Sequence, residues 1–367
     1  MTHNVRFGFA FAMTAALAAT TARAADPSSS LKSGTPDVKS AGPLTFGPDG
    51  ILFVGDTQGA AIFAIDTGDR KPAKAAPIHV TDIAKKVAAR LGTEASKILI
   101  NDVAVNPVSG QAYLSVSRGR GPDATPVILR VGAEGKLEEV SLEHVKFAKA
   151  DLPNPPAQGA QARGQSLRNE SVTDLAYVDG RVFIAGLSNE EFSSRLISVP
   201  FPFTDQPDGA AIEIYHGAHG KFETKSPIRT FVAYTINNES YLMAAYTCTP
   251  LVKVAVAQLK PGAQVKGTTI AELGNRNRPL DMIVYEKDGK DFLLLANSSR
   301  GVMKIPTEGA SKAQSITKPV KDKEGLGYET IAALKGVVQL DKLDKGHAVA
   351  LIQTDGGALN LETIELP

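Results

Sequence analysis

Short apolar segments joined by turns recur along most of the chain. In each copy a polar residue leads into an apolar strand, a turn follows, and a second apolar strand ends in a polar cluster. β-Branched and aromatic residues fill the segments, and Asp-Gly, Asn-Pro, Ser-Gly or Lys-Asp-Gly turns bound them, as is typical of antiparallel β-strand pairs. The copies begin at Thr45, Asp102, Asp174, Thr230, Asp281 and Val338.

A third strand follows most of the copies, and a fourth often follows the third. Ile62 to Ile65 and Leu196 to Val199 have the pattern of third strands, and Ile212 to Tyr215 has that of a fourth. Four antiparallel strands repeated six times predict an all-β fold, a six-bladed β-propeller. A β-sandwich is the alternative, but sandwiches do not repeat one motif along nearly the whole chain.

The last copy lacks a fourth strand, because its third strand is followed by the end of the sequence. An unpaired strand edge is a liability that proteins cover. We therefore expect residues 25–41 to close the ring as a strand of the last blade, or else to form a tail, with the propeller covering residues 42–367.

Two insertions lengthen the spacing between copies. After Thr81 as N-cap, Ile83, Val87 and Leu91 fall on one face of an expected helix. The stretch from His144 to Glu170 is rich in Pro, Gly, Gln and Ala, and we expect a long surface loop there.

The first residues have the pattern of a secretory signal. Arg6 precedes an apolar run from Phe7 to Ala19, and Ala22-Arg23-Ala24 places small residues at a cleavage site. The run is shorter than the ~20 residues that span a bilayer. We expect residues 1–24 to be removed and the mature protein to be periplasmic, or secreted, without inserting into the membrane.

Composition narrows the possible partners. The chain has 40 basic and 39 acidic residues, and loss of Arg6 and Arg23 with the signal leaves 38 against 39. This balance, without a basic cluster, argues against nucleic acid. Cys248 is the single cysteine, which excludes an intrachain disulfide and a Cys-x-x-Cys-His haem site. We expect a monomer whose partner is a small polar molecule or a periplasmic protein.

Candidate ligand-binding groups gather at one rim of the predicted channel. The starts of the innermost strands and the ends of the second strands share this face, so we expect a polar rim that includes Asn101, Asp102, Asp174, Arg229, Asp281, Asn297 and Arg300. The three aspartates could hold a hard cation such as Ca²⁺, which prefers oxygen ligands. The alternative is that each carboxylate accepts backbone N–H groups of the adjoining blade.

A second group combines two imidazoles and the thiol. His216 and His219 lie on the loop that enters the fourth copy, and Cys248 ends its second strand. Such side chains suit copper or zinc. The alternative is two loop histidines in a Gly-rich turn and a small buried cysteine.

The first copy carries a resemblance to a known superfamily. Pro43, Thr45, Phe46, Asp49, Gly50, Phe53, Val54 and Asp56 make up a Pro-led strand, an Asp-Gly turn, an aromatic-Val strand and an Asp. This resembles the repeat of NHL-type propellers and their lactonase-like (gluconolactonase-like) relatives. The resemblance implies a six-bladed propeller and, for the lactonase-like members, a catalytic Ca²⁺ held by a Glu near the N-terminus, by Asn and by Asp. Here Thr45 stands in place of that Glu, and only Asn101 and Asn297 are placed as the asparagines.

Three functions follow from these patterns. We expect a non-catalytic propeller that binds a small polar ligand or a partner protein at its rim. The alternatives are a Ca²⁺-dependent lactonase-like hydrolase and a periplasmic copper- or zinc-binding protein. The chain has no tryptophan, which argues against the docking motif of quinoprotein (PQQ) alcohol dehydrogenases, and it has no Gly-x-Ser-x-Gly nucleophile elbow.

Overall fold

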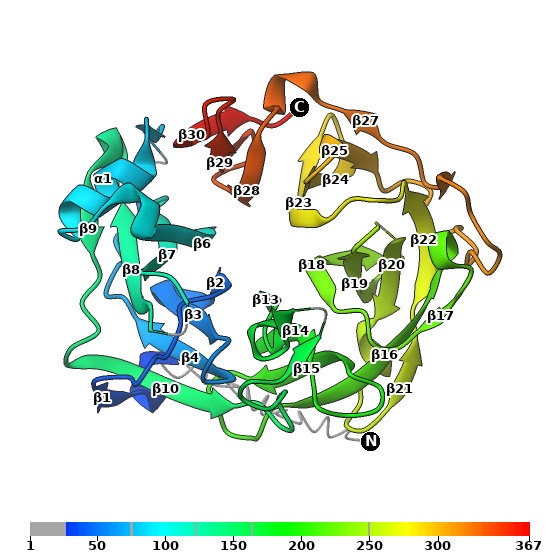
Figure 1. Cartoon of the computed structure of the whole chain (residues 1–367), viewed down its shortest axis with the longest axis horizontal. Coiled ribbons are helices and arrows are strands. Elements are labelled where there is room, and N and C mark those ends of the chain that lie inside the picture. The colour runs from blue at the N-terminus through cyan, green and yellow to red at the C-terminus, as the bar shows by residue number, and fades with distance from the viewer. Residues whose placement is uncertain (1–26, 74–75, 122, 163, 249) are drawn as a thin grey trace, which may run out of the picture.

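Six small antiparallel sheets stand around a central channel and form a six-bladed β-propeller (Figure 1). The computed structural model describes residues 27–73, 76–121, 123–162, 164–248 and 250–367. The expected signal peptide, residues 1–24, lies outside the described residues. No helix in the described part of the chain is long and apolar enough to cross a membrane.

We number the blades by the order of their innermost strands in the sequence, and within a blade the strands run from the channel outward. Blade one is β2 (Leu44–Phe46), β3 (Ile51–Asp56), β4 (Ala61–Asp66), β10 (Val145–Asp151) and β1 (Lys32–Gly34). Blade two is β6 (Ile98–Val105), β7 (Ala112–Arg118), β8 (Thr125–Val131) and β9 (Leu137–Glu139). Blade three is β13 (Asp174–Val178), β14 (Arg181–Leu187), β15 (Ser194–Pro200), β16 (Asp208–His216) and β17 (Lys221–Glu223), with β21 (Gln264–Lys266) parallel to β16.

The other three blades follow the same plan. Blade four is β18 (Ile228–Ile236), β19 (Glu239–Tyr246), β20 (Pro250–Ala255), β22 (Thr268–Leu273) and β26 (Lys323–Gly325). Blade five is β23 (Pro279–Lys287), β24 (Lys290–Asn297), β25 (Gly301–Pro306) and β27 (Glu329–Thr330). Blade six is β28 (Val337–Lys342), β29 (His347–Gln353), β30 (Leu359–Glu365) and β5 (His79–Val80).

The blades do not follow one another around the ring in sequence order. The inner strand β28 of blade six lies against β6 of blade two, β6 lies against β2 of blade one, and β2 lies against β13 of blade three. The spatial order is therefore six, two, one, three, four, five (Figure 1). The six predicted copies are confirmed, but blades one and two exchange the places that a consecutive ring would give them.

Apolar layers between neighbouring blades form the core. One layer joins Val349 and Leu351 of blade six to Val103 and Leu114 of blade two, and other layers follow the same spatial order around the ring. Both faces of a middle strand are therefore buried, as in β3, where every residue is buried. This explains why the middle strands are continuous apolar runs rather than alternating ones.

Exchanged strands connect the blades out of sequence: β5 pairs in blade six, β10 in blade one, β21 in blade three and β26 in blade four. The strand that completes blade six is β5, whose Val80 pairs with Leu361 of β30. The expectation that residues 25–41 fill this place is wrong, because β1 instead pairs with β10 on the outer edge of blade one. The ring is closed by a strand from the N-terminal part of the chain, as expected, but this strand, β5, comes after β4 of blade one in the sequence.

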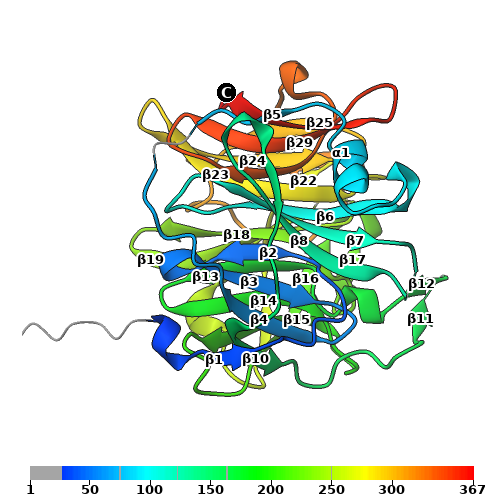
Figure 2. The same cartoon turned by 90° about the vertical axis from the view of Figure 1, so that its left-hand side faces the viewer.

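The two predicted insertions have different outcomes. The helix is α1 (Ile83–Arg90), which buries Ile83 and Val87 on the outside of the ring beside blades two and six (Figure 2). Its N-cap is Asp82 rather than Thr81. The expected loop from His144 to Glu170 is wrong in part, because it contains β10 and the hairpin of β11 (Gln161–Ala162) and β12 (Gln165–Ser166).

Short 3₁₀ helices occupy several of the connections. They span Pro27–Ser30, Pro48–Gly50, Ala95–Lys97, Ala133–Gly135, Arg168–Glu170, Gly217–His219, Val256–Gln258 and Ala332–Leu334.

Candidate functional site

Aspartates on four of the six innermost strands each connect their own blade to one neighbouring blade. One carboxylate oxygen accepts the N–H of the next residue in its own strand, and the other accepts an N–H from the neighbouring blade. The interblade bonds are Leu44 N to Asp102 Oδ2 (2.7 Å), Phe231 N to Asp174 Oδ2 (2.7 Å), Leu340 N to Asp281 Oδ2 (2.8 Å) and Val105 N to Asp341 Oδ2 (2.7 Å). All four carboxylates therefore bridge two blades in the same way.

The same carboxylates repel one another across the channel. Burial raises the pKa of Asp174 to about 7 and that of Asp341 to about 6. Burial, followed by the charges of Asp102 and Asp174, raises the pKa of Asp281 well above its usual range. Backbone N–H bonds oppose this rise, because they favour the ionised form.

The structure does not gather these aspartates into a shared set of metal ligands. Across the described residues, the group of three or more His, Cys, Asp or Glu side chains whose ligand atoms converge is His216, His219 and Cys248. Asp102, Asp174 and Asp281 each satisfy backbone N–H groups instead, which is the alternative that the sequence left open. Asp341 was not predicted from the sequence, because it lies further along its strand than the expected copy start at Val338.

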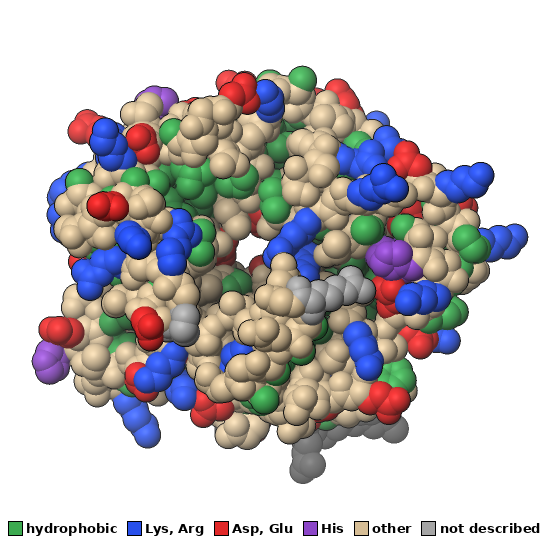
Figure 3. Space-filling view, viewed as in Figure 1, with side chains coloured by type: hydrophobic (Ala, Val, Ile, Leu, Met, Phe, Trp, Pro, Cys, Tyr) green, Lys and Arg blue, Asp and Glu red, His purple; other side chains and the backbone are tan. Residues whose placement is uncertain are grey.

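A cavity of 790 Å³ lies at the mouth of the channel. Inner-strand β-bulges supply part of its wall, because a bulge leaves one residue unpaired and turns its side chain out of the sheet. Asn101 and Arg229 are such residues, at the register shifts of β6 and β18. Other polar lining residues include Lys39, Ser40, Ser117, Arg120, Glu170, Thr173, Arg278 and Gln339. Figure 3 shows Lys and Arg side chains beside the central opening.

Positive charge exceeds negative charge in this cavity. Arg229 Nη1 lies 2.5 Å from Glu170 Oε2, so these two charges compensate each other. Arg120 donates to the carbonyls of Ser96 and Ile98 and has no acidic partner within the described residues. The exposed Arg278 lies close enough to lower the pKa of Arg229, although burial lowers it more. The described part of the chain offers the Arg278 guanidinium no carboxylate.

Two predicted rim residues lie elsewhere. Asn297 is the buried last residue of β24, and its Oδ1 accepts the N–H groups of Ser299 and Arg300 in the turn that follows. The Arg300 side chain pairs with Asp322. Neither residue lines the mouth cavity, so both act in the blade five turn. Arg120 and Glu170 were not predicted, because they lie in connections whose sequence has no strand periodicity.

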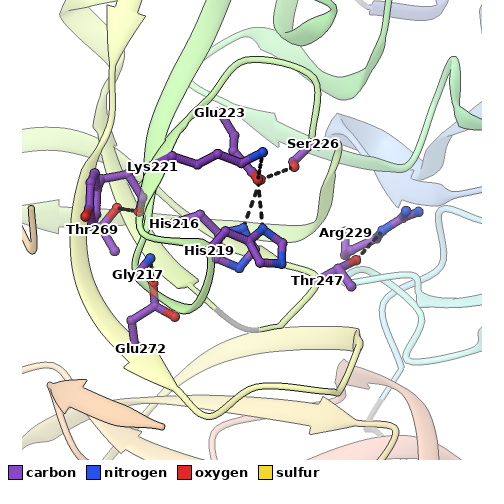
Figure 4. Close-up of polar contacts among 11 residues, drawn as sticks. His216, Gly217, His219, Lys221, Glu223, Ser226, Arg229, Thr247, Thr269 and Glu272 are labelled. Carbon is purple, nitrogen blue, oxygen red and sulfur yellow. Dashed lines mark hydrogen bonds and ion pairs between the residues drawn. The ribbon is translucent and has the colours of Figure 1, made fainter. Parts of the chain in front are cut away.

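The histidine–cysteine group is brought together from two connections of neighbouring blades. His216 ends β16, His219 ends the following 3₁₀ turn, and Cys248 lies in the turn after β19. Their ligand atoms all lie within 4.8 Å of one another. Figure 4 shows both imidazoles directed at Glu223 on one side.

Comparison with known proteins identifies no family for this chain. No family model matches the chain, and no curated protein matches it. Among solved structures, the plexin A4 extracellular region is 8% identical with a TM-score of 0.36, and the alignment covers 91% of this chain but only 47% of that one. An oxidoreductase described as a glucose dehydrogenase, from Thermus thermophilus, is 11% identical with a TM-score of 0.34, covering 91% of this chain and 99% of that one. The PQQ-bound aldose sugar dehydrogenase of Streptomyces coelicolor is 10% identical with a TM-score of 0.32, covering 91% and 96%.

The order of the sheets around the channel confirms the propeller part of the predicted resemblance. Its NHL-type or lactonase-like part stays a prediction.

Proposed function

We propose that this protein is an exported, non-catalytic β-propeller that binds a small, anionic, polar molecule in the cavity at the mouth of its channel. The observation that carries the proposal is the cavity itself, 790 Å³ in volume, with arginines that outnumber its carboxylates. Small-molecule sites are concave and fall in this range of volume.

Two guanidinium groups define the chemistry of the ligand. Arg120 and Arg278 lack acidic partners in the described part of the chain, and a guanidinium binds carboxylate or phosphate oxygens with two parallel hydrogen bonds. The amides of Asn101 and Gln339 and the hydroxyl of Thr173 can add neutral hydrogen bonds that orient a polar ligand.

The lining residues favour binding over catalysis. No His, Cys or Asp lines the cavity among the described residues, and its one carboxylate, Glu170, is paired with Arg229. A general base needs a free group whose pKa lies near the working pH. A lactonase-like hydrolase would need converging oxygen ligands for Ca²⁺, and the channel aspartates are held by backbone N–H groups instead.

Titration with citrate and with inorganic phosphate, followed by calorimetry and thermal shift at low salt, tests the proposal. We expect at least one of these anions to bind. We expect Arg278→Gln to weaken binding about 10- to 100-fold, since one charge-assisted contact contributes roughly 1.5–3 kcal/mol. Arg90→Gln, on the exposed face of α1, is the matched control and should leave binding unchanged. Equal affinity of the two variants, or no binding of either anion by the parent protein, would contradict the proposal.

A further inference from the structure

We propose that His216, His219 and Cys248 form a mononuclear metal site for zinc or copper, with one coordination position open to solvent. The site is separate from the mouth cavity and rests on different observations. Its evidence is the convergence of three ligand atoms, the orientation of both imidazoles, and a buried nitrogen without a partner.

The three ligand atoms come from two connections, one that carries both histidines and one that carries Cys248. They lie within 4.8 Å of one another, and the two imidazole rings have centroids 3.8 Å apart. Ligands at ~2.0–2.3 Å from one ion are ~3–4 Å from each other, so a small adjustment would complete the site. The set of two nitrogens and one sulfur suits zinc and copper and does not suit Ca²⁺ or Mg²⁺.

One carboxylate fixes the orientation of both imidazoles. Glu223 Oε2 lies 2.9 Å from His216 Nδ1, and Glu223 Oε1 lies 2.7 Å from His219 Nδ1 (Figure 4). Ser226 Oγ donates to Glu223 Oε2 at 2.7 Å, which holds the carboxylate in place. A carboxylate that accepts from Nδ1–H leaves the Nε2 lone pair for a metal, and metal-binding histidines commonly have such a partner.

His216 Nε2 is the atom that the rest of the fold does not explain. His216 is 2% exposed, and this nitrogen has no hydrogen-bond partner among the described residues. A buried polar atom without a partner costs roughly 1–3 kcal/mol. A metal ion among the three ligands would remove that cost, since it would replace the missing partner.

The backbone at both segments is shaped to bring the ligands together. Cys248 has a backbone φ of 62°, in the left-handed region that residues other than glycine rarely adopt. Its N–H donates to the Asn277 carbonyl at 2.9 Å. Such strain concentrates at functional sites. Gly217 separates the histidines, and a Cβ there would lie 2.8 Å from Glu272 Oε1, so the turn needs glycine.

Access to the site is through its exposed edge. The His219 side chain is 46% exposed and Cys248 is partly exposed, whereas His216 is buried. The three protein ligands leave a fourth position for water or another small ligand, as in zinc sites that are not purely structural. Thr247, next to Cys248, accepts a bond from Arg229 Nε at 3.1 Å, so the site borders the mouth cavity.

Metal titration of chelator-treated, reduced protein tests this proposal. We expect one equivalent of Zn²⁺ to bind, measured by competition with a chromophoric chelator. Co²⁺ as a zinc probe, and Cu²⁺ separately, should each give a thiolate charge-transfer band. His219→Ala and Cys248→Ser should each weaken binding at least ~100-fold, and Cys248→Ser should abolish the charge-transfer band. The metal bound more tightly in this competition identifies the ion that the site prefers.

Two further variants separate the metal site from a structural role. Glu223→Gln should weaken binding ~10–100-fold, since Glu223 positions the ligands without touching the ion. His347→Ala is the matched control, because His347 is similarly exposed and its Nδ1 also lies 2.9 Å from a carboxylate, that of Asp344. Failure of the parent protein to bind Zn²⁺ or Cu²⁺ would overturn the proposal, as would unchanged affinity in His219→Ala and Cys248→Ser with their fold intact by circular dichroism.

Discussion

At the residue scale, the channel aspartates join the blades to one another. Each carboxylate accepts one N–H from its own strand and one from the adjacent blade. It therefore adds a directional hydrogen bond between two blades whose apolar layers make only non-directional contacts. The arrangement brings buried negative charges together, and burial raises the pKa of each. Interblade bonding is therefore obtained at an electrostatic cost that depends on pH.

Asp174→Ala should lower the free energy of unfolding by about 1–3 kcal/mol at pH 5, because the N–H groups of Leu175 and Phe231 lose their acceptors. The folded-state pKa of Asp174, about 7, lies above its ordinary value of 3.8. The folded protein therefore binds more protons than the unfolded chain between these values, and its stability falls as pH rises from about 4 to about 7. The Asp174→Ala variant lacks this carboxylate, so this fall in stability with rising pH is absent from it.

Denaturant unfolding at pH 5 and pH 8 measures both effects. The destabilisation caused by Asp174→Ala should be smaller at pH 8 than at pH 5, and Asp205→Ala, in an exposed loop, should stay within about 0.5 kcal/mol of the parent protein at both. A destabilisation of equal size at pH 5 and pH 8 would contradict this prediction, because it would mean that Asp174 is already ionised in the folded protein at pH 5.

At the scale of single elements, long buried strands could be predicted from the sequence and short outer strands could not. Middle strands such as β3 and β24 were predictable, because both of their faces are buried and they read as apolar runs. The outer strands β5 and β27 were not, since each has only two residues, and the partner of β5 lies near the other end of the sequence. β10 carried a readable alternation, but the Pro- and Gly-rich stretch after it obscured the signal.

The candidate sites divide in the same way. Inner-strand positions such as Asn101 and Arg229 were predictable because the repeat places them. Arg120 and Glu170 were not, because only the folded loops bring them to the cavity. The repeat also placed Asp102, Asp174 and Asp281, but residue type alone could not decide between a cation and backbone N–H groups as their partner.

Ile78→Ala should lower the free energy of unfolding by about 2–5 kcal/mol, because it leaves a hole where the segment before β5 packs on blade six. Ile78 is 1% exposed, its N–H donates to Thr363 Oγ1, and its carbonyl accepts the Thr363 N–H. Leu99→Ala, at a side chain that is 45% exposed, is the control. Equal midpoints of urea denaturation for the two variants would refute the closure of blade six by this segment.

At the scale of the whole molecule, the ring order is the feature that the repeat could not predict. The repeated motif predicts that six blades form, but it does not predict which blades lie side by side. That order depends on the apolar layers between blades, which pack blade six against blade two and blade one against blade three. The aspartate bonds agree, since Asp341 of blade six bonds to Val105 of blade two.

Asp341→Ala tests this order directly. We expect faster hydrogen exchange at the Val105 amide, by about tenfold or more, because its acceptor lies on blade six. The Leu44 amide, which is held by Asp102 of blade two, should keep its protection. A consecutive ring would place blade one beside blade six, and in that case blade one amides would lose protection while Val105 would not.

The exchanged strands also determine when the ring can be completed during folding. Blade one stays without its fourth strand until all of blade two has been made, and the bond from Ile78 to Thr363 joins residues 285 positions apart. Contacts between such distant residues close large loops and form late. An N-terminal fragment therefore has exposed blade edges, and neither end of the finished chain offers a complete blade that could detach by itself. We accordingly expect assembly and loss of the ring to be single cooperative events that require nearly the full chain.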